Sequence, residues 1–153
     1  MNVGDLVADF ELPDQDGRPW RLSTALSDGP VVLFFYPAAL TGGCTAEACH
    51  FRDLTAEFHS VGAQRVGISA DTVATQKKFA GANRFDFPLL SDHDGVVARQ
   101  FGVRRGPLGR RLGLPVKRMT FVIDTSGAIR EVIASERQMD VHADRALAAL
   151  LRG

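Results

Sequence analysis

The chain has 153 residues, 45% of them hydrophobic and 24% charged, and its 18 basic side chains balance 18 acidic ones. This size and composition suit one domain over residues 1–153, and the zero net charge gives no indication of a nucleic-acid partner. No apolar run approaches the roughly 18 residues of a membrane span, and the first residues lack the basic and apolar segments of a signal peptide. A cytoplasmic location without a membrane partner is therefore expected.

The first part of the chain predicts a hairpin, a strand and a helix. Apolar and polar residues alternate on both sides of Asp16-Gly17, which indicates a β-hairpin. Residues 31–36 are continuously apolar and β-rich, which is typical of a central strand covered on both faces. After a loop with Gly42 and Gly43, apolar residues recur at steps of three and four, so we expect a helix over about residues 44–58.

The middle of the chain continues this alternation of strands and helices. Residues 64–70 predict a second buried strand, and Asp71 can cap a helix that ends near Ala82. A short strand is expected over 87–90 and a short helix over 95–101. Residues 104–116 contain three glycines, two prolines and four arginines, which favours an irregular loop.

The last part predicts two strands over 119–123 and 128–134, joined by the turn 124–127, and a helix through residue 151 that Asp140 can cap. Strands that alternate with helices indicate an α/β fold, with a largely buried sheet and helices on both faces. Parallel strand pairs in such a sheet would be joined by right-handed crossovers.

Two cysteines, Cys44 and Cys49, are the first candidates for chemistry. Cys44 follows a glycine-rich turn at a predicted helix start, where unpaired N–H groups and a partial positive charge favour a thiolate over a thiol. Gly42 and Gly43 would let a small substrate approach the backbone amides closely. The alternative for either cysteine is a small buried apolar residue.

The spacing of the two cysteines restricts what they can do. Residues five apart in an ideal helix have Cα atoms roughly 8.6 Å apart, whereas a disulfide needs about 7 Å or less. A bond between Cys44 and Cys49 therefore requires the first turns of the helix to unwind. The spacing matches neither a C-x-x-C exchanger nor a structural zinc site, and we expect the four histidines to be structural or solvated. Residues 92–95 favour a turn over a metal site.

The residues Pro37, Thr41 and Cys44 form the pattern Pro-x-x-x-Thr-x-x-Cys. This pattern, with residues 34–53, resembles the peroxiredoxins, specifically the bacterioferritin-comigratory or peroxiredoxin Q branch. Segments 4–12, 88–92 and 118–124 are similar to the same branch, so the resemblance covers almost the whole chain. It implies a thioredoxin-like fold of peroxiredoxin type, with a central mixed sheet, helices on both faces and an N-terminal β-hairpin.

The resemblance also implies roles for the two cysteines. Cys44 would be the peroxidatic cysteine, which attacks a peroxide oxygen and becomes a sulfenic acid. Cys49 would resolve that sulfenic acid as an intramolecular redox disulfide with Cys44. Hydrogen peroxide or an organic hydroperoxide would be the substrate, and thioredoxin or a similar dithiol protein would reduce the disulfide. No metal, haem or flavin is implied, and a monomer is expected, with a weak dimer as the alternative.

Four further residues receive roles from the resemblance. Thr41 would place its hydroxyl near the thiolate and the peroxide, and Arg118 would bind the peroxide and favour the thiolate. Pro37 would shape and shield the pocket, and Glu47 would orient an arginine. Gly42 departs from the branch, which usually has proline there, and this change is expected to ease unwinding of the helix start.

Two other functions remain open from the residues. The same pair of cysteines could serve a redox sensor whose disulfide signals to a partner. Unwinding of the helix could also expose apolar surface, as in a chaperone-like holdase. Neither alternative needs rapid turnover of peroxide.

Overall fold

The computed structural model describes residues 1–152 and contains a five-stranded mixed sheet with the strand order β5-β4-β3-β6-β7. The central strand β3 is parallel to β4 and antiparallel to β6, while β5 extends the parallel side and β7 the antiparallel side. The strands are β3 (Val31–Phe35), β4 (Gln64–Ser69), β5 (Leu89–Ser91), β6 (Met119–Ile123) and β7 (Ile129–Ala134).

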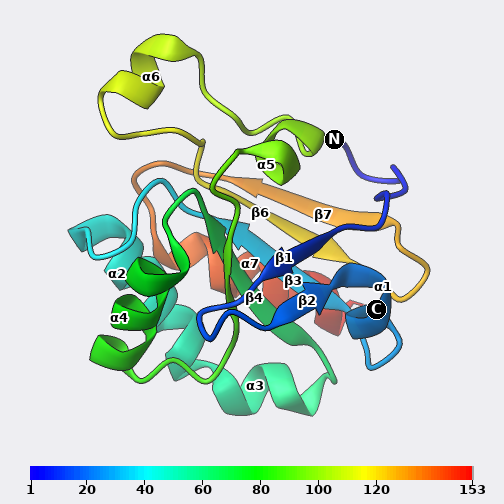
Figure 1. Cartoon of the computed structure of the whole chain (residues 1–153). Helices are drawn as coiled ribbons and strands as arrows, with labels where there is room; N and C mark the ends of the chain where they lie inside the picture. The colour runs from blue at the N-terminus through cyan, green and yellow to red at the C-terminus, as the bar shows by residue number, and fades with distance from the viewer. Residues whose placement is uncertain (153) are drawn as a thin grey trace.

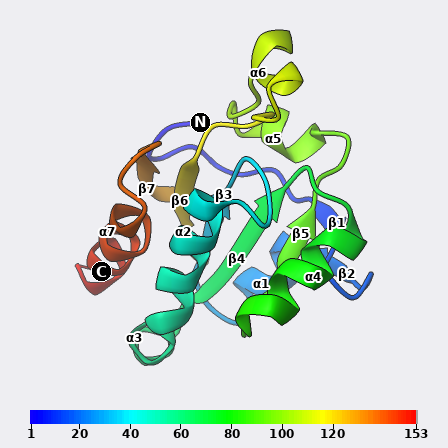
Figure 2. The same cartoon turned by 90° about the vertical axis from the view of Figure 1, so that its left-hand side faces the viewer.

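Seven helices occur within residues 1–152, and they cover both faces of the sheet (Figures 1 and 2). In Figure 2, α2 and α4 lie in front of the sheet, and α6 projects from the top of the molecule. The helices are α1 (Leu22–Leu26), α2 (Gly42–Asp53), α3 (Thr55–Ser60), α4 (Val73–Asn83), α5 (Val96–Gln100), α6 (Pro107–Arg111) and α7 (Asp140–Leu151).

The two faces of β3 supply two apolar cores, because successive side chains of a strand point to opposite faces. Val32 and Phe34 pack into a cluster with α2, α3, α4 and α7. Val31, Leu33 and Phe35 pack into the other, with α1, α5 and the N-terminal segment. All five side chains are fully buried, which confirms the prediction of a central strand covered on both faces.

The predicted N-terminal hairpin is confirmed as a small separate sheet. Strands β1 (Glu11–Pro13) and β2 (Pro19–Arg21) pair antiparallel, with Leu12 opposite Trp20. The carboxylate of Asp14 accepts hydrogen bonds from two backbone N–H groups of the turn, and Gly17 has the positive φ of 76° that such a turn favours.

The helix expected over 44–58 is two helices, and that prediction was wrong in its continuity. Helix α2 begins at Gly42, and its last turn ends before Leu54, whose φ of −96° and ψ of 22° leave the helical region. Two side chains take up carbonyls there, since Arg65 donates to the carbonyl of Phe51 (2.8 Å) and Thr55 donates to that of Arg52 (2.6 Å). Side chains that bind these carbonyls compete with continuation of the helix.

Both predicted aspartate caps were wrong. Thr72 caps α4, because its hydroxyl accepts a hydrogen bond from the N–H of Thr75, while Asp71 accepts from the N–H of Ala39 (2.7 Å). Asp71 thus holds the loop that leads into α2. Asp140 is the first residue of α7 rather than its cap, which is Met139.

Two short helices were not predicted. Helix α6 lies within the expected loop 104–116, where Pro107 suits a first helical position. Helix α1 follows β2 directly, and the carboxylate of Asp9 accepts from the N–H of Ser23 in its first turn (2.8 Å). In the part of the chain that the structure describes, no helix is both long enough and apolar enough to cross a membrane.

Candidate active site

Cys44 is the third residue of α2, directly after the loop that leaves the central strand β3. The first N–H groups of a helix have no partner within the helix, and they place a partial positive charge at this end. The Cys44 side chain is 1% exposed, and both cysteines are free. Cys44 therefore has the helix N-terminal position predicted for it, although the helix starts two residues earlier than expected.

Arg118 is the residue directly before β6, and the tertiary fold brings its guanidinium to Cys44. Nη2 of Arg118 donates to Sγ of Cys44 at 3.3 Å. Gly43 leaves room for this approach, since a Cβ there would lie 3.2 Å from the same nitrogen, which is tighter than an ordinary contact. Burial disfavours the charge of Arg118, but Glu47 and Cys44 outweigh it, so the pKa of Arg118 lies above its ordinary value.

Glu47 lies one turn after Cys44 on α2, and its side chain is fully buried. Its Oε1 accepts from Nη1 of Arg118 at 2.9 Å, as expected for a carboxylate that orients the arginine. Burial raises the pKa of Glu47 to about 8, even though the charge and hydrogen bond of Arg118 act to lower it. One guanidinium thus joins the carboxyl group to the sulfur of Cys44 through two of its nitrogens.

Thr41 and Pro37 lie in the loop that enters α2. Thr41 is the residue that precedes the helix, with an extended φ of −91° and ψ of 157°, and its hydroxyl donates to the carbonyl of Ala38 (2.8 Å). Pro37 is buried, two residues after the end of β3. Leu40, between them, has a φ of 65°, a conformation that few non-glycine residues adopt. Both predicted residues thus lie close to Cys44 along the chain, and a hydrogen bond to its sulfur comes from Arg118.

Cys49 faces a different neighbour, the end of α4. Its thiol is half-buried and donates to Oδ1 of Asn83 at 3.6 Å, while Nη1 of Arg52 donates to the carbonyl of the same asparagine at 2.8 Å. Both cysteines lie on the intact helix α2, in which residues five apart have Cα atoms about 8.6 Å apart. The structure therefore shows the form in which Cys44 and Cys49 are not joined by a disulfide.

His142, one of the four histidines expected to be structural or solvated, is buried next to Glu47 and was not predicted to lie beside this site. It lies on α7, fully buried, with Nδ1 3.5 Å from Oε2 of Glu47. Its position among Ala143 and Ala146 on the buried side of an amphipathic helix was the available signal. Burial, the largest effect, holds the pKa of His142 below its ordinary value.

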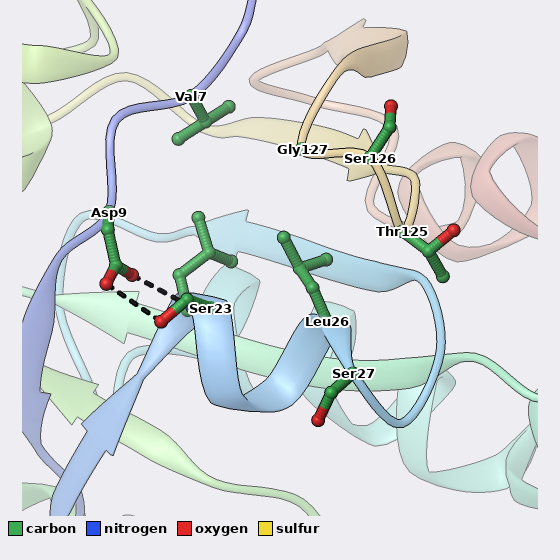
Figure 3. A pocket seen from close by; sticks show the side chains of 9 residues that line it. Val7, Asp9, Ser23, Leu26, Ser27, Thr125, Ser126 and Gly127 are labelled. Atoms are coloured by element: carbon green, nitrogen blue, oxygen red, sulfur yellow. Dashed lines mark hydrogen bonds between the residues drawn. The ribbon is translucent and has the colours of Figure 1, made fainter.

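A surface hollow of about 390 Å³ lies away from Cys44, between the N-terminal segment, α1 and the turn after β6 (Figure 3). Its carboxylate, Asp9, already accepts from the N–H and the hydroxyl of Ser23, both at 2.8 Å. We therefore place no reaction there. Within residues 1–152, no group of three or more His, Cys, Asp or Glu side chains is arranged to hold a metal ion.

Comparison with known proteins agrees with this fold. The model of the AhpC/TSA family matches residues 3–132. A putative peroxiredoxin of Mycobacterium tuberculosis is 67% identical over 150 residues, which cover 98% of this chain and 96% of that protein. Chloroplastic peroxiredoxin Q of Sedum lineare is 40% identical over 150 residues, which cover 98% of this chain and 78% of that protein.

Solved structures show the same similarity. Peroxidoxin BcpB of Mycobacterium tuberculosis matches with a TM-score of 0.93 and 65% identity, covering 99% of this chain and 97% of that chain. The bacterioferritin comigratory protein of Xanthomonas campestris matches with a TM-score of 0.83 and 32% identity, covering 94% and 90%. The fold is therefore thioredoxin-like, of peroxiredoxin type. The chain belongs to the AhpC/TSA family, as a peroxiredoxin of the bacterioferritin-comigratory or peroxiredoxin Q branch, and this class implies thiol peroxidase activity.

Proposed function

We propose that the protein is a peroxidase in which Cys44 attacks the peroxide and Cys49 resolves the product. The contact between Nη2 of Arg118 and Sγ of Cys44, at 3.3 Å in a buried site, carries this proposal. A cation and the N-terminus of α2 both favour the thiolate, which is the nucleophilic form of cysteine.

The first step is a two-electron oxidation of Cys44. The thiolate sulfur attacks the terminal oxygen of a hydroperoxide, the O–O bond breaks, and the leaving oxygen takes a proton and departs as water or an alcohol. Cys44 becomes a sulfenic acid. Arg118 has nitrogens that can donate to the peroxide as charge develops on its oxygens. The hydroxyl of Thr41 gives its hydrogen to Ala38, so its lone pairs can accept the hydrogen of the hydroperoxide.

The second step forms the disulfide. The sulfur of Cys49 attacks Sγ of the Cys44 sulfenic acid, the S–O bond breaks, and water leaves after the oxygen takes a proton. Because the helix separates the two residues, the first turns of α2 unwind before the bond forms. A dithiol protein such as thioredoxin then supplies two electrons and two protons, which restores both thiols.

Hydrogen peroxide and small organic hydroperoxides are the proposed substrates. The Xanthomonas campestris relative is described for its alkyl peroxide reduction activity, which supports the organic class. Pro37 would border the pocket and limit access of water. We expect the protein to be a cytoplasmic monomer, and a thioredoxin-type reductant would be available to it in the cytoplasm.

A coupled assay tests this function. Purified protein, thioredoxin, its reductase and NADPH are mixed with hydrogen peroxide or a bulky lipid hydroperoxide, and NADPH consumption is followed. We expect turnover that Cys44→Ser abolishes, whereas Cys49→Ser should complete one oxidation and keep a sulfenic acid that a dimedone probe labels. Turnover retained by Cys44→Ser would reject the proposal, and an oxidisable pair without turnover would favour the redox sensor.

A further inference from the structure

The reaction above leaves His142 unused, although this histidine is buried beside the active site. Its Nε2 is 2.9 Å from the carbonyl oxygen of Ser135, and its Nδ1 is 2.8 Å from the hydroxyl of Thr120. A carbonyl oxygen can only accept, so Nε2 carries a hydrogen and donates it to Ser135. The atom that faces Glu47 is therefore Nδ1.

Glu47 has one oxygen without a partner. Oε1 accepts from Arg118, but Oε2 is buried without a hydrogen bond and lies 3.5 Å from Nδ1 of His142. A neutral imidazole and an ionised carboxylate would turn lone pairs toward each other here, and a buried unpaired acceptor is costly. One proton between the two atoms, on Oε2 or on Nδ1, removes this conflict. The Thr120 hydroxyl fits either position, because it can donate or accept.

The presence of that proton, on either atom, sets the charge around Cys44. With one proton, the pair of Glu47 and His142 has no net charge, whether the carboxyl or the imidazole holds it. The guanidinium of Arg118 then faces a single anion, the thiolate of Cys44. Without the proton the same guanidinium would face two anions, and its hold on the thiolate would weaken.

We propose that His142 is a positioning residue that, together with Glu47, retains one proton and so commits the charge of Arg118 to the Cys44 thiolate. This inference rests on the proposed role of Cys44 as the attacking thiolate. His142 acts through Glu47 and Arg118 and needs no contact with the peroxide.

The other charged groups near the pair are consistent with a retained proton. Glu136 accepts from the backbone N–H of Arg118 (3.1 Å) and from Nη2 of Arg105 (2.8 Å), and its charge disfavours a second anion at Glu47. Arg145 on α7 and Arg118 both disfavour a cation at His142. Burial favours the neutral form of both members, since it raises the pKa of Glu47 and lowers that of His142, so the carboxyl is the favoured holder of the proton.

The test measures the titration of Cys44 without peroxide. In the Cys49→Ser background, the rate of alkylation by iodoacetamide is followed against pH. His142→Gln replaces the Nδ1 acceptor with an amide that can donate to Glu47 and stabilise its ionised form. We expect alkylation near pH 6 to slow by about threefold or more, because less of Cys44 would be in the thiolate form. Adding Glu47→Gln, which cannot ionise, should restore the rate.

His50→Gln is the matched control, since His50 also joins α2 to α7 through Asp144 (2.8 Å), but on the exposed side. Its alkylation rate should depend on pH in the same way as that of the Cys49→Ser parent. Glu47→Gln alone provides a measurement that does not depend on folding of the His142 variant, and it should keep the alkylation rate near pH 6 within about twofold.

A His142→Gln profile that matches His50→Gln would overturn the proposal, as would failure of Glu47→Gln to restore the double variant. A slow Glu47→Gln single variant would overturn it too. Because alkylation requires no peroxide, the expected titration pattern in a protein without peroxidase turnover would reject the proposed function and leave this network supported.

Discussion

Cys44 lies at the end of a series of contacts between side chains from separate parts of the chain. Arg118 arrives from the start of β6, Glu47 from the next turn of α2 and His142 from α7. Their burial makes each charge dependent on the others, because little water screens them. The protonation of Glu47 is therefore a property of the folded site as much as of the residue.

This coupling predicts a pH dependence of stability. The folded protein keeps a proton on Glu47 up to about pH 8, whereas the unfolded chain releases it near the ordinary value of 4.5. Between these values the free energy of unfolding falls as pH rises, since the folded state binds the extra proton. His142, with a lowered pKa, has the opposite effect, but only below its ordinary value of 6.5.

The free energy of unfolding in urea is measured for wild type and Glu47→Gln between pH 6.5 and about pH 8. In this range His142 no longer contributes, so the measurement isolates the effect of Glu47. The wild type should lose stability across this window, and the variant should lose less. Glu57→Gln, an exposed change on α3, is the control. Parallel curves for wild type and Glu47→Gln would contradict the raised pKa.

At the scale of the element, helix α2 is anchored by stacking and hydrogen bonds at its C-terminal end and lacks a side-chain cap at its N-terminal end. Phe51 stacks on Phe34 with ring centroids 4.3 Å apart, and Arg65 binds the carbonyl of Phe51. At the other end the hydroxyl of Thr41 makes no cap, and two glycines follow. Unwinding for the disulfide should therefore start at Gly42 and stop before Phe51.

Gly42→Pro tests the weak end. Gly42 is the first helical residue, nothing lies within 4 Å of a Cβ placed there, and Thr41 already has the extended backbone that precedes proline. We expect about 0.4–1 kcal/mol of added stability and slower disulfide formation after a single oxidation. Trp20 fluorescence during unfolding measures the stability, and stopped-flow mixing followed by thiol quenching measures the rate of disulfide formation. Gly81→Ala in α4 is the control, and equal slowing there would contradict the local explanation.

Arg65→Met tests the fixed end. Arg65 is 4% exposed, donates to Phe51, Thr55 and Asp86, and lies over the ring of Phe87 at 5.1 Å. Its loss leaves the carbonyl of the buried Phe51 without this donor and removes the ion pair to the exposed Asp86, so we expect a destabilisation of about 2 kcal/mol. Urea midpoints measure it, with the exposed Arg18→Met as the control. A shift in the urea midpoint equal to that of Arg18→Met would show that the contacts of Arg65 do not stabilise this end of α2.

At the scale of the whole molecule, the sheet and the helices around it form the frame within which the first turns of α2 are expected to unwind. The central strand β3 places the loop before α2, and β6 beside it delivers Arg118 (Figure 1). Antiparallel pairing of β3 with β6 puts Phe35 opposite Met119, so the residues next to them, at the exit of β3 and the entry of β6, meet. The frame thus keeps the site together while part of α2 changes.

Oxidation should therefore lower the helix content and leave the sheet intact. Circular dichroism at 222 nm of the reduced and the peroxide-treated protein measures this change. The loss should correspond to about two helical turns, since the five-residue spacing forbids a bond in the intact helix. Cys49→Ser, which cannot form the disulfide, should keep its spectrum. An unchanged wild-type spectrum despite a formed disulfide would contradict unwinding.

Patterns that are local in the chain predicted most of the elements correctly. Residues 31–36 and the hairpin around Asp16-Gly17 were recognised because their periodicity or continuity lies within a few residues. Helix α1 was missed because its first turn is satisfied by Asp9, which lies 14 residues before Ser23 in the chain. The break at Leu54 was missed because Arg65 and Thr55 create it through contacts made in the folded state.

The sequence alone determined the family, the two cysteines and their separation of five residues, because the motif around Cys44 and the geometry of a helix are local properties. It linked Arg118 to that site only through the resemblance. The tertiary structure decided which charges meet: Arg118 between Cys44 and Glu47, and His142 behind Glu47. Burial and partner distance set the protonation of these groups, and both exist only after distant segments of the chain have packed together.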